Sequence, residues 1–178
     1  MEKDEYAIVL DFLPYGYPMS GKMQPIAQAV GEKTLIILEI IPRRGMTLET
    51  KEKVYIGSGK RDKVYFIAGR VAPEKVTETT KTQLSEFLSE FVANNEQRFV
   101  EFYNKAPAIN TRLHQIELLP GFGQKHLHEL LKSREEKPFA SFAEMKERLS
   151  SLPDPKKAIE KRIVEELLTK PRFKLFVK

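Results

Sequence analysis

The feature that most constrains this chain is a change in the spacing of its apolar residues near Pro73. Before that point, short apolar runs rich in β-branched residues are separated by turns that contain Gly and Pro, a pattern typical of strands. Beyond it, apolar residues recur every three or four positions, as in helices that bury one face. A chain that places its strands first and its helices afterwards is expected to form an α+β protein, here a small β-barrel followed by a helical region.

Four apolar runs in residues 1–72 are the expected strands of the β domain. They cover residues 6–13, 34–41, 54–56 and 64–68. The last two flank a Gly-Ser-Gly-Lys turn at residues 57–60, which predicts a β-hairpin. Residues 25–30 begin with Pro and are followed by Gly31, and this punctuation predicts a short helix.

A long connecting helix is expected over residues 73–105, followed by a separate helical domain over residues 106–178. Thr77 or Thr80 can serve as the N-cap of the long helix, and a stripe of Leu, Val and Phe falls on one of its faces. Such a stripe is far more often part of a core than of a cofactor pocket.

Charge and cysteine content narrow the class of partner. Residues 1–104 carry 14 Lys or Arg and 15 Asp or Glu, whereas residues 105–178 carry 16 and 10, so the excess positive charge lies in the C-terminal part. A basic surface of this kind favours phosphate-rich partners. The absence of Cys excludes disulfides and thiolate sites, and no apolar run is long enough to span a bilayer. With no leader-like N-terminus, these features predict a soluble, cytoplasmic protein that does not bind membranes.

A tight turn between two helices is expected at residues 119–123, with the sequence Leu-Pro-Gly-Phe-Gly. Apolar residues have helical spacing before it, in residues 112–118, and again after it, in residues 124–134. The two glycines permit a close turn of the backbone, and Phe122 is expected to fill the gap between the helices.

Such a turn would present the amide groups of residues 123–125 at the start of the second helix, where no intrahelical acceptor exists. These donors, the helix dipole and the charge of Lys125 together predict a site for a phosphate group. The alternative is a Gly-terminated helix pair that binds nothing. The nucleic-acid-binding residues predicted at this turn are Gly121, Phe122, Gly123, Gln124, Lys125 and His126.

Residues 119–123 followed by Lys125 resemble the helix-hairpin-helix motif of DNA ligases, repair polymerases and a Holliday-junction-binding branch-migration subunit. The resemblance implies that the amide groups of the turn hold a backbone phosphate without reading the base sequence. It also implies that a monovalent cation can lie beside the phosphate, and no other cofactor is expected. The sequence departs from the motif at Leu127, where a small residue is usual, and this departure bears on the distance between the helices.

A second turn with the sequence Leu-Pro-Asp-Pro, at residues 152–155, repeats the Leu-Pro start at an offset of 33 residues. Asp154 is expected as the N-cap and Pro155 as the first residue of the helix that follows. The paired turns resemble the double helix-hairpin-helix unit. Lys156 and Lys157 are predicted to widen the surface that contacts nucleic acid.

The whole chain is similar to a family of uncharacterised archaeal proteins that are predicted to bind RNA. The similarity is carried by residues 6–13, 55–57 and 112–121. It implies an OB-like N-terminal barrel followed by a double helix-hairpin-helix domain, and it weakly favours RNA over DNA as the ligand.

The N-terminal barrel is a second candidate contact for nucleic acid, because aromatic and basic side chains near its turns could stack bases and neutralise phosphates. The alternative is that these are ordinary surface loops. The nucleic-acid-binding residues predicted there are Arg43, Arg44, Lys60 and Arg61. Tyr15, Tyr17, Lys22 and Lys63 are further candidates of the same kind.

No set of residues supports catalysis or metal binding. Residues 57–60 end like a P-loop but lack its earlier Gly and the Ser or Thr that follows the Lys. His126 and His128 are two positions apart on a helix, so they point to different faces and cannot bind one metal ion. We therefore expect a non-enzymatic protein without catalytic residues or a metal site.

A module that binds another protein in a ribosomal or repair assembly is the alternative function. A nuclease or ligase subunit is disfavoured because the sequence has no acid cluster for a catalytic metal ion. The sequence leaves open the choice between DNA and RNA, the choice between single and double strands, and the oligomeric state.

Overall fold

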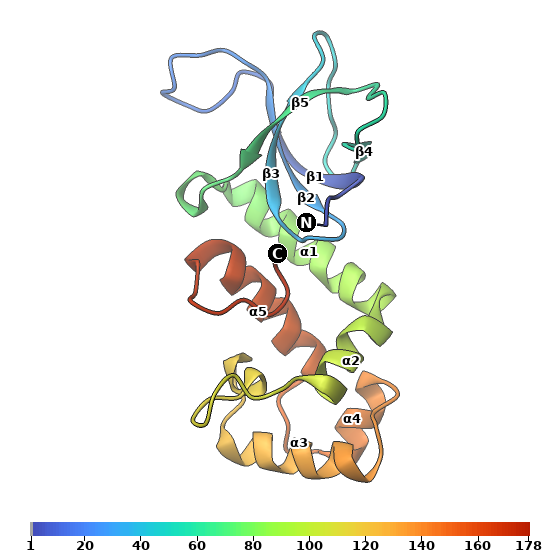
Figure 1. The fold of residues 1–178 in the computed structure, drawn as a ribbon. Coiled ribbons are helices and arrows are strands. Elements are labelled where there is room, and N and C mark those ends of the chain that lie inside the picture. The colour runs from blue at the N-terminus through green and yellow to red at the C-terminus, as the bar shows by residue number, and fades with distance from the viewer. Residues whose placement is uncertain (1) are drawn as a thin grey trace. The chain divides into compact units, whose positions relative to one another are not determined.

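The structure is a computed structural model that describes residues 2–178 (Figure 1). Over these residues it has a five-stranded antiparallel half-barrel followed by five α-helices, so the predicted α+β class is confirmed. None of these helices is long and apolar enough to cross a bilayer. Contacts divide the chain into two compact units, one comprising the chain up to Glu86 together with Glu165–Lys178, the other Phe87–Val164.

The half-barrel has the strand order β4-β1-β2-β3-β5, and every neighbouring pair is antiparallel, so β4 and β5 are the edges of the sheet. Small and branched side chains from its strands form a buried cluster that includes Ala7, Val9, Ala27, Ile40 and Val54. The strands are β1 (Tyr6–Leu13), β2 (Ile26–Gly31), β3 (Ile37–Pro42), β4 (Lys53–Tyr55) and β5 (Val64–Arg70).

Two predictions about this part of the chain are wrong. Residues 26–30 belong to the fully buried strand β2 rather than to a short helix, because a strand buried on both faces lacks the polar and apolar alternation that identifies strands. β4 and β5 do not form a hairpin with each other, since β4 pairs with β1 and β5 pairs with β3. Both strands run in the same direction, because β1 and β3 do and each pairing is antiparallel, so the segment at residues 57–60 is not a hairpin turn.

The expected long helix over residues 73–105 is instead three elements. Thr77 caps the first α-helix, because its Oγ1 accepts a hydrogen bond from the amide of Thr80 at 3.0 Å. Asn95 separates the two α-helices, and its Nδ2 donates to the carbonyl oxygen of Phe91 at 2.9 Å, in competition with the helical backbone. The elements are η1 (Pro73–Lys75), α1 (Glu78–Asn94) and α2 (Glu96–Lys105).

The helix predicted over residues 112–118 is also wrong, because only a 3₁₀ turn forms there. Side chains compete for the backbone donors of this segment: the amide of Arg112 donates to Oδ1 of Asn110 at 2.8 Å, and the amide of Ile116 donates to Nδ1 of His114 at 3.1 Å. The remaining elements are η2 (Gln115–Leu118), α3 (Gln124–Glu136), α4 (Phe142–Arg148) and α5 (Pro155–Thr169).

Candidate nucleic-acid interface

The turn at residues 119–123, between η2 and α3, requires glycine at one position. Gly121 has a φ of +83°, in the left-handed region that other residues enter at a cost of about 1–2 kcal/mol. A Cβ atom at Gly121 would also lie 3.3 Å from Cγ of Pro153. The first Leu-Pro turn therefore packs against the second one, and the lack of a side chain at Gly121 allows this approach.

Phe122 anchors the turn and does not offer a surface contact. Its ring is buried, with its centroid 6.0 Å from that of Tyr103 and 5.9 Å from that of His126. The hydroxyl of Tyr103 donates to the carbonyl oxygen of Pro155 at 2.6 Å, so the same aromatic group also holds the first residue of α5. This packing fixes the start of α3 while leaving Gly123 at the surface.

The start of α3 presents backbone amide groups to solvent. Gly123 is the N-cap, and it has no side chain that could accept from the first turn of the helix. Its own amide donates to Nδ1 of His126 at 3.1 Å. Within residues 2–178, no group accepts a hydrogen bond from the amide of Gln124 or Lys125, and both residues are exposed. Two of the three predicted amides are therefore available to an anion beside the Lys125 side chain, and the third is bonded to an imidazole.

The second turn has a different arrangement at the start of α5. Oδ1 of Asp154 accepts from the amides of Lys156 at 3.0 Å and Lys157 at 3.1 Å. The Asp154 carboxylate also pairs with Lys146 at 2.7 Å, and the side chain of Lys156 pairs with Glu160 at 3.0 Å. A carboxylate thus lies where a phosphate would bind, and of the two predicted lysines only Lys157 has an exposed side chain.

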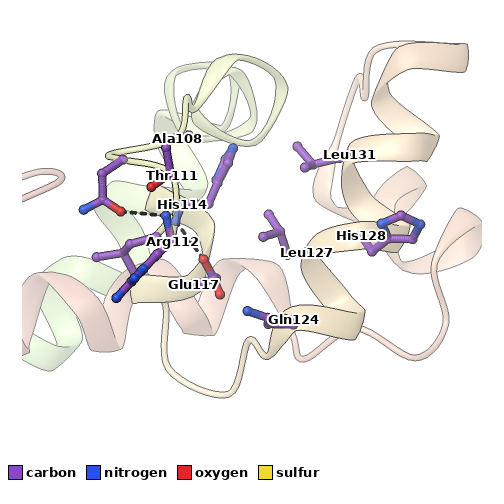
Figure 2. A pocket seen from close by; sticks show the side chains of 11 residues that line it. Ala108, Thr111, Arg112, His114, Glu117, Gln124, Leu127, His128 and Leu131 are labelled. Carbon is purple, nitrogen blue, oxygen red and sulfur yellow. Dashed lines mark hydrogen bonds between the residues drawn. The ribbon is translucent and has the colours of Figure 1, made fainter.

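A pocket of about 280 Å³ lies beside the first turn, between the loop that precedes η2 and one face of α3 (Figure 2). Leu127 and Leu131 point from α3 toward the loop that carries Thr111 and His114 (Figure 2). Leu127, the departure from the helix-hairpin-helix motif, therefore lines a pocket rather than a close contact of two helices. Within residues 2–178, no three His, Asp or Glu side chains converge as ligands for a metal ion.

We expect the buried His114 beside this pocket to make stability depend on pH. Burial, together with the charge of Arg134, lowers the pKa of His114 below its ordinary 6.5, and the hydrogen bond from the amide of Ile116 needs a neutral Nδ1. The unfolded chain therefore takes up this proton more readily than the folded one, so the free energy of unfolding should decrease as the pH falls below about 6.5. Urea unfolding at several values from about pH 8 to about pH 5, the range in which His titrates, measures this change in the free energy of unfolding.

The variant His114→Asn keeps an acceptor for the Ile116 amide and cannot titrate. It should show a smaller loss of stability across the same pH range. An identical pH dependence in both proteins would mean that His114 does not cause it.

The four basic residues predicted in the barrel belong to the unit that holds the sheet. Nε of Arg43 donates to the carbonyl oxygen of Arg61 at 2.7 Å, and Nε of Arg61 donates to the carbonyl oxygen of Gly57 at 2.8 Å. The structure therefore brings Arg43 and Arg61 together. Arg44 and Lys60 are exposed on the same two turns.

The aromatic residues of this unit differ in how accessible they are. Tyr17 is held within the fold, because its hydroxyl donates to Oε2 of Glu39 at 2.8 Å. Burial, reinforced by Glu39, raises the pKa of Tyr17 to about 12. Tyr15 is exposed, and so are Tyr65 and Phe66 on β5, two residues that were not among the predicted contacts. Two adjacent aromatic residues within a predicted strand indicate that at least one of the rings is exposed, because consecutive strand residues point to opposite faces.

Comparison with known proteins places the chain among archaeal relatives. It is 42% identical over 177 residues to the uncharacterized protein MJ0038 of Methanocaldococcus jannaschii, covering 98% of this chain and 80% of that protein. The crystal structure of Af1531 from Archaeoglobus fulgidus matches with a TM-score of 0.86 and 37% identity, covering 98% of this chain and 100% of that chain. The profile of a family described as "Protein of unknown function (DUF655)" matches residues 3–178. The chain therefore belongs to the DUF655 family.

Proposed function

We propose that the protein is a non-enzymatic nucleic-acid-binding protein that holds a backbone phosphate at the turn between η2 and α3. The contrast between its two turns carries this proposal. At the second turn, Asp154 supplies the acceptor for the first amides of α5. At the first turn, Gly123 supplies none, so the amides of Gln124 and Lys125 remain donors without a protein acceptor among residues 2–178. A phosphate oxygen would complete this helix start as a carboxylate completes the other.

The chemistry of the turn predicts how binding should behave. Main-chain donors and Lys125 contact phosphate groups and no base edges, so affinity should be independent of base sequence. Affinity should also fall as the salt concentration rises, because each neutralised phosphate releases counterions. RNA is proposed ahead of DNA on the family resemblance alone, and the phosphate site itself suits either polymer.

The variant Gly123→Asp tests the proposal by copying the Asp154 cap onto the first turn. The new carboxylate should accept from the exposed amides and add roughly a few tenths of a kcal/mol to the free energy of unfolding, because Gly is already a tolerated N-cap residue. It also places negative charge where the phosphate would bind. We expect the affinity for a fluorescein-labelled single-stranded RNA to fall at least about tenfold, a loss of about 1.4 kcal/mol in binding. Fluorescence anisotropy at several salt concentrations measures it, with single-stranded and duplex DNA and duplex RNA in parallel.

Two lysine variants, one in the first turn of α3 and one at its C-cap, form a matched test and control. Lys125→Ala removes a charge beside the exposed amides and should weaken binding, whereas Lys137→Ala removes an exposed charge at the opposite end of α3 and should not. Unchanged RNA affinity in a folded Gly123→Asp protein would show that the turn is not the site. Failure of the natural protein to bind any of the four polymers at low salt would end the proposal.

A further inference from the structure

Two large aromatic side chains are exposed next to each other on the edge strand β5. Tyr65 is 65% exposed and Phe66 is 44% exposed, and their ring centroids lie 5.7 Å apart, edge to face. Consecutive residues of a regular strand point to opposite faces of the sheet, so one of the two would be expected to face the core. The register explains the exception: Phe66 pairs with Ile41 and Val64 pairs with Pro42, which leaves Tyr65 as the extra residue of a β-bulge.

The shape of β5 argues against a β-strand of another protein as the partner of Tyr65 and Phe66. Exposed apolar side chains on an edge strand promote aggregation unless something covers them. A second irregularity follows at Ala68, between the pairs Glu39–Gly69 and Ile40–Ile67. A strand with two bulges offers a broken row of donors and acceptors and is a poor template for an added β-strand.

Positive charge is concentrated beside the pair. Residues 42–47 and 57–70 carry six Lys or Arg and one Asp, whereas the rest of residues 1–104 carries eight Lys or Arg and 14 Asp or Glu. The N-terminal part is nearly neutral as a whole, but its basic residues are concentrated in these two segments and all but one of its acidic residues lie elsewhere. These two segments are the turn after β3 and the chain that enters and forms β5 (Figure 1). A polyanion is the partner that this charge distribution favours.

Two arginines of the turns before β5 are held in place without a carboxylate partner among residues 2–178. The amide of Arg43 donates to the carbonyl oxygen of Lys63 at 2.8 Å, so Arg43 lies beside the residue two positions before Tyr65. The side chains of Arg43 and Arg61 donate to carbonyl oxygens, and within residues 2–178 neither forms an ion pair. Lys63, by contrast, pairs with Glu52. Two guanidinium groups therefore lie on the turns that precede β5 with carbonyl oxygens, and not carboxylates, as their partners.

We infer that β5 carries a stacking platform for single-stranded nucleic acid, with bases on Tyr65 and Phe66 and phosphates at Arg43 and Arg61. Bases within a duplex are stacked on one another, so only a single strand can offer base faces to exposed rings. Every base has such a face, so the platform tolerates any sequence. The inference rests on the proposed function in that both need a nucleic acid, but it assigns a separate site and a strand type.

A tryptophan reporter tests the platform directly. The 178 residues include no Trp, so Tyr65→Trp places a single indole on the platform of this chain. Adding an oligouridine RNA of about 12 nucleotides should quench the indole fluorescence by base stacking, and a duplex of similar length should leave it unchanged. In a second variant, Tyr65→Leu with Phe66→Leu keeps apolar side chains and removes the rings. Its affinity for the oligouridine should fall at least about tenfold, with duplex affinity unchanged.

Tyr6→Leu is the matched control, because Tyr6 is an exposed aromatic residue of β1, at 40%, and not of β5. Absence of quenching at saturating RNA, or unchanged oligouridine affinity of the double Leu variant, overturns the platform. Quenching by anionic lipid vesicles and not by RNA overturns it as well. The experiments distinguish the two sites. If only Gly123→Asp loses binding, the turn binds nucleic acid and the platform does not. If only the double Leu variant loses binding, the platform binds and the turn does not.

Discussion

Replacing Glu166 by Ala is expected to release the C-terminal residues of the chain and to destabilise the unit that holds the sheet. The Glu166 side chain on α5 is 1% exposed, and its carboxylate accepts from three successive amides, those of Leu175, Phe176 and Val177. Phe176 and Val177 are themselves buried. Removing the carboxylate leaves these donors without their acceptor, and bonds to a charged acceptor are stronger than neutral ones. We expect the free energy of unfolding to fall by on the order of 3–5 kcal/mol.

Urea unfolding followed by circular dichroism measures this loss, and limited proteolysis shows whether residues 170–178 become accessible. Glu166→Gln keeps the shape and one acceptor oxygen, so it should lose less stability than Glu166→Ala. Glu136→Ala removes an exposed acid from the end of α3 and should change little. A Glu166→Ala protein with the natural unfolding midpoint and a protected C-terminus would show that other contacts hold this segment.

Local features of the sequence predict the elements of the fold better than their partners. The apolar run at residues 6–13 predicts β1 correctly, and Asp154 and Pro155 begin α5 as expected, because a helix start is decided within one turn of the chain. The strands β4 and β5 lie close to their predicted positions but pair with β1 and β3. Strand pairing is decided by burial between segments far apart in the sequence, which a turn motif does not report.

The candidate sites also differ in whether local sequence features predict them. Gly and Pro predict the turn at residues 119–123, and the positive φ of Gly121 is a backbone conformation that Gly adopts readily. The exposure of both Tyr65 and Phe66 could not be predicted, because the bulge that allows it arises from the register between two strands rather than from a residue type. The cap at Asp154 was predictable. That one helix start has a carboxylate acceptor and the other has none becomes clear only when both helix starts are compared.

A second large loss of stability is expected from Gln28→Leu, because Gln28 joins β2 to the segment that begins α1. Its side chain has no exposed surface, and within residues 2–178 it forms four hydrogen bonds, all with other residues of the same unit. Nε2 donates to the carbonyl oxygen of Lys75 at 2.8 Å and to the hydroxyl of Tyr17 at 3.1 Å. Oε1 accepts from the amide of Thr77 at 3.2 Å and from the hydroxyl of Thr80 at 2.7 Å.

Leu has a similar size but no polar atom, so Gln28→Leu removes the shared partner of these four groups. We expect the free energy of unfolding to fall by about 2–4 kcal/mol, since buried groups left without partners lose their compensation for desolvation. Thr80→Val removes only one of the four bonds and should cost about 1 kcal/mol. Gln24→Leu changes an exposed Gln just before β2 and is the matched control in the same urea unfolding series. A Gln28→Leu protein as stable as the natural one would mean that packing alone accounts for Gln28, because the lost hydrogen bonds would then contribute nothing.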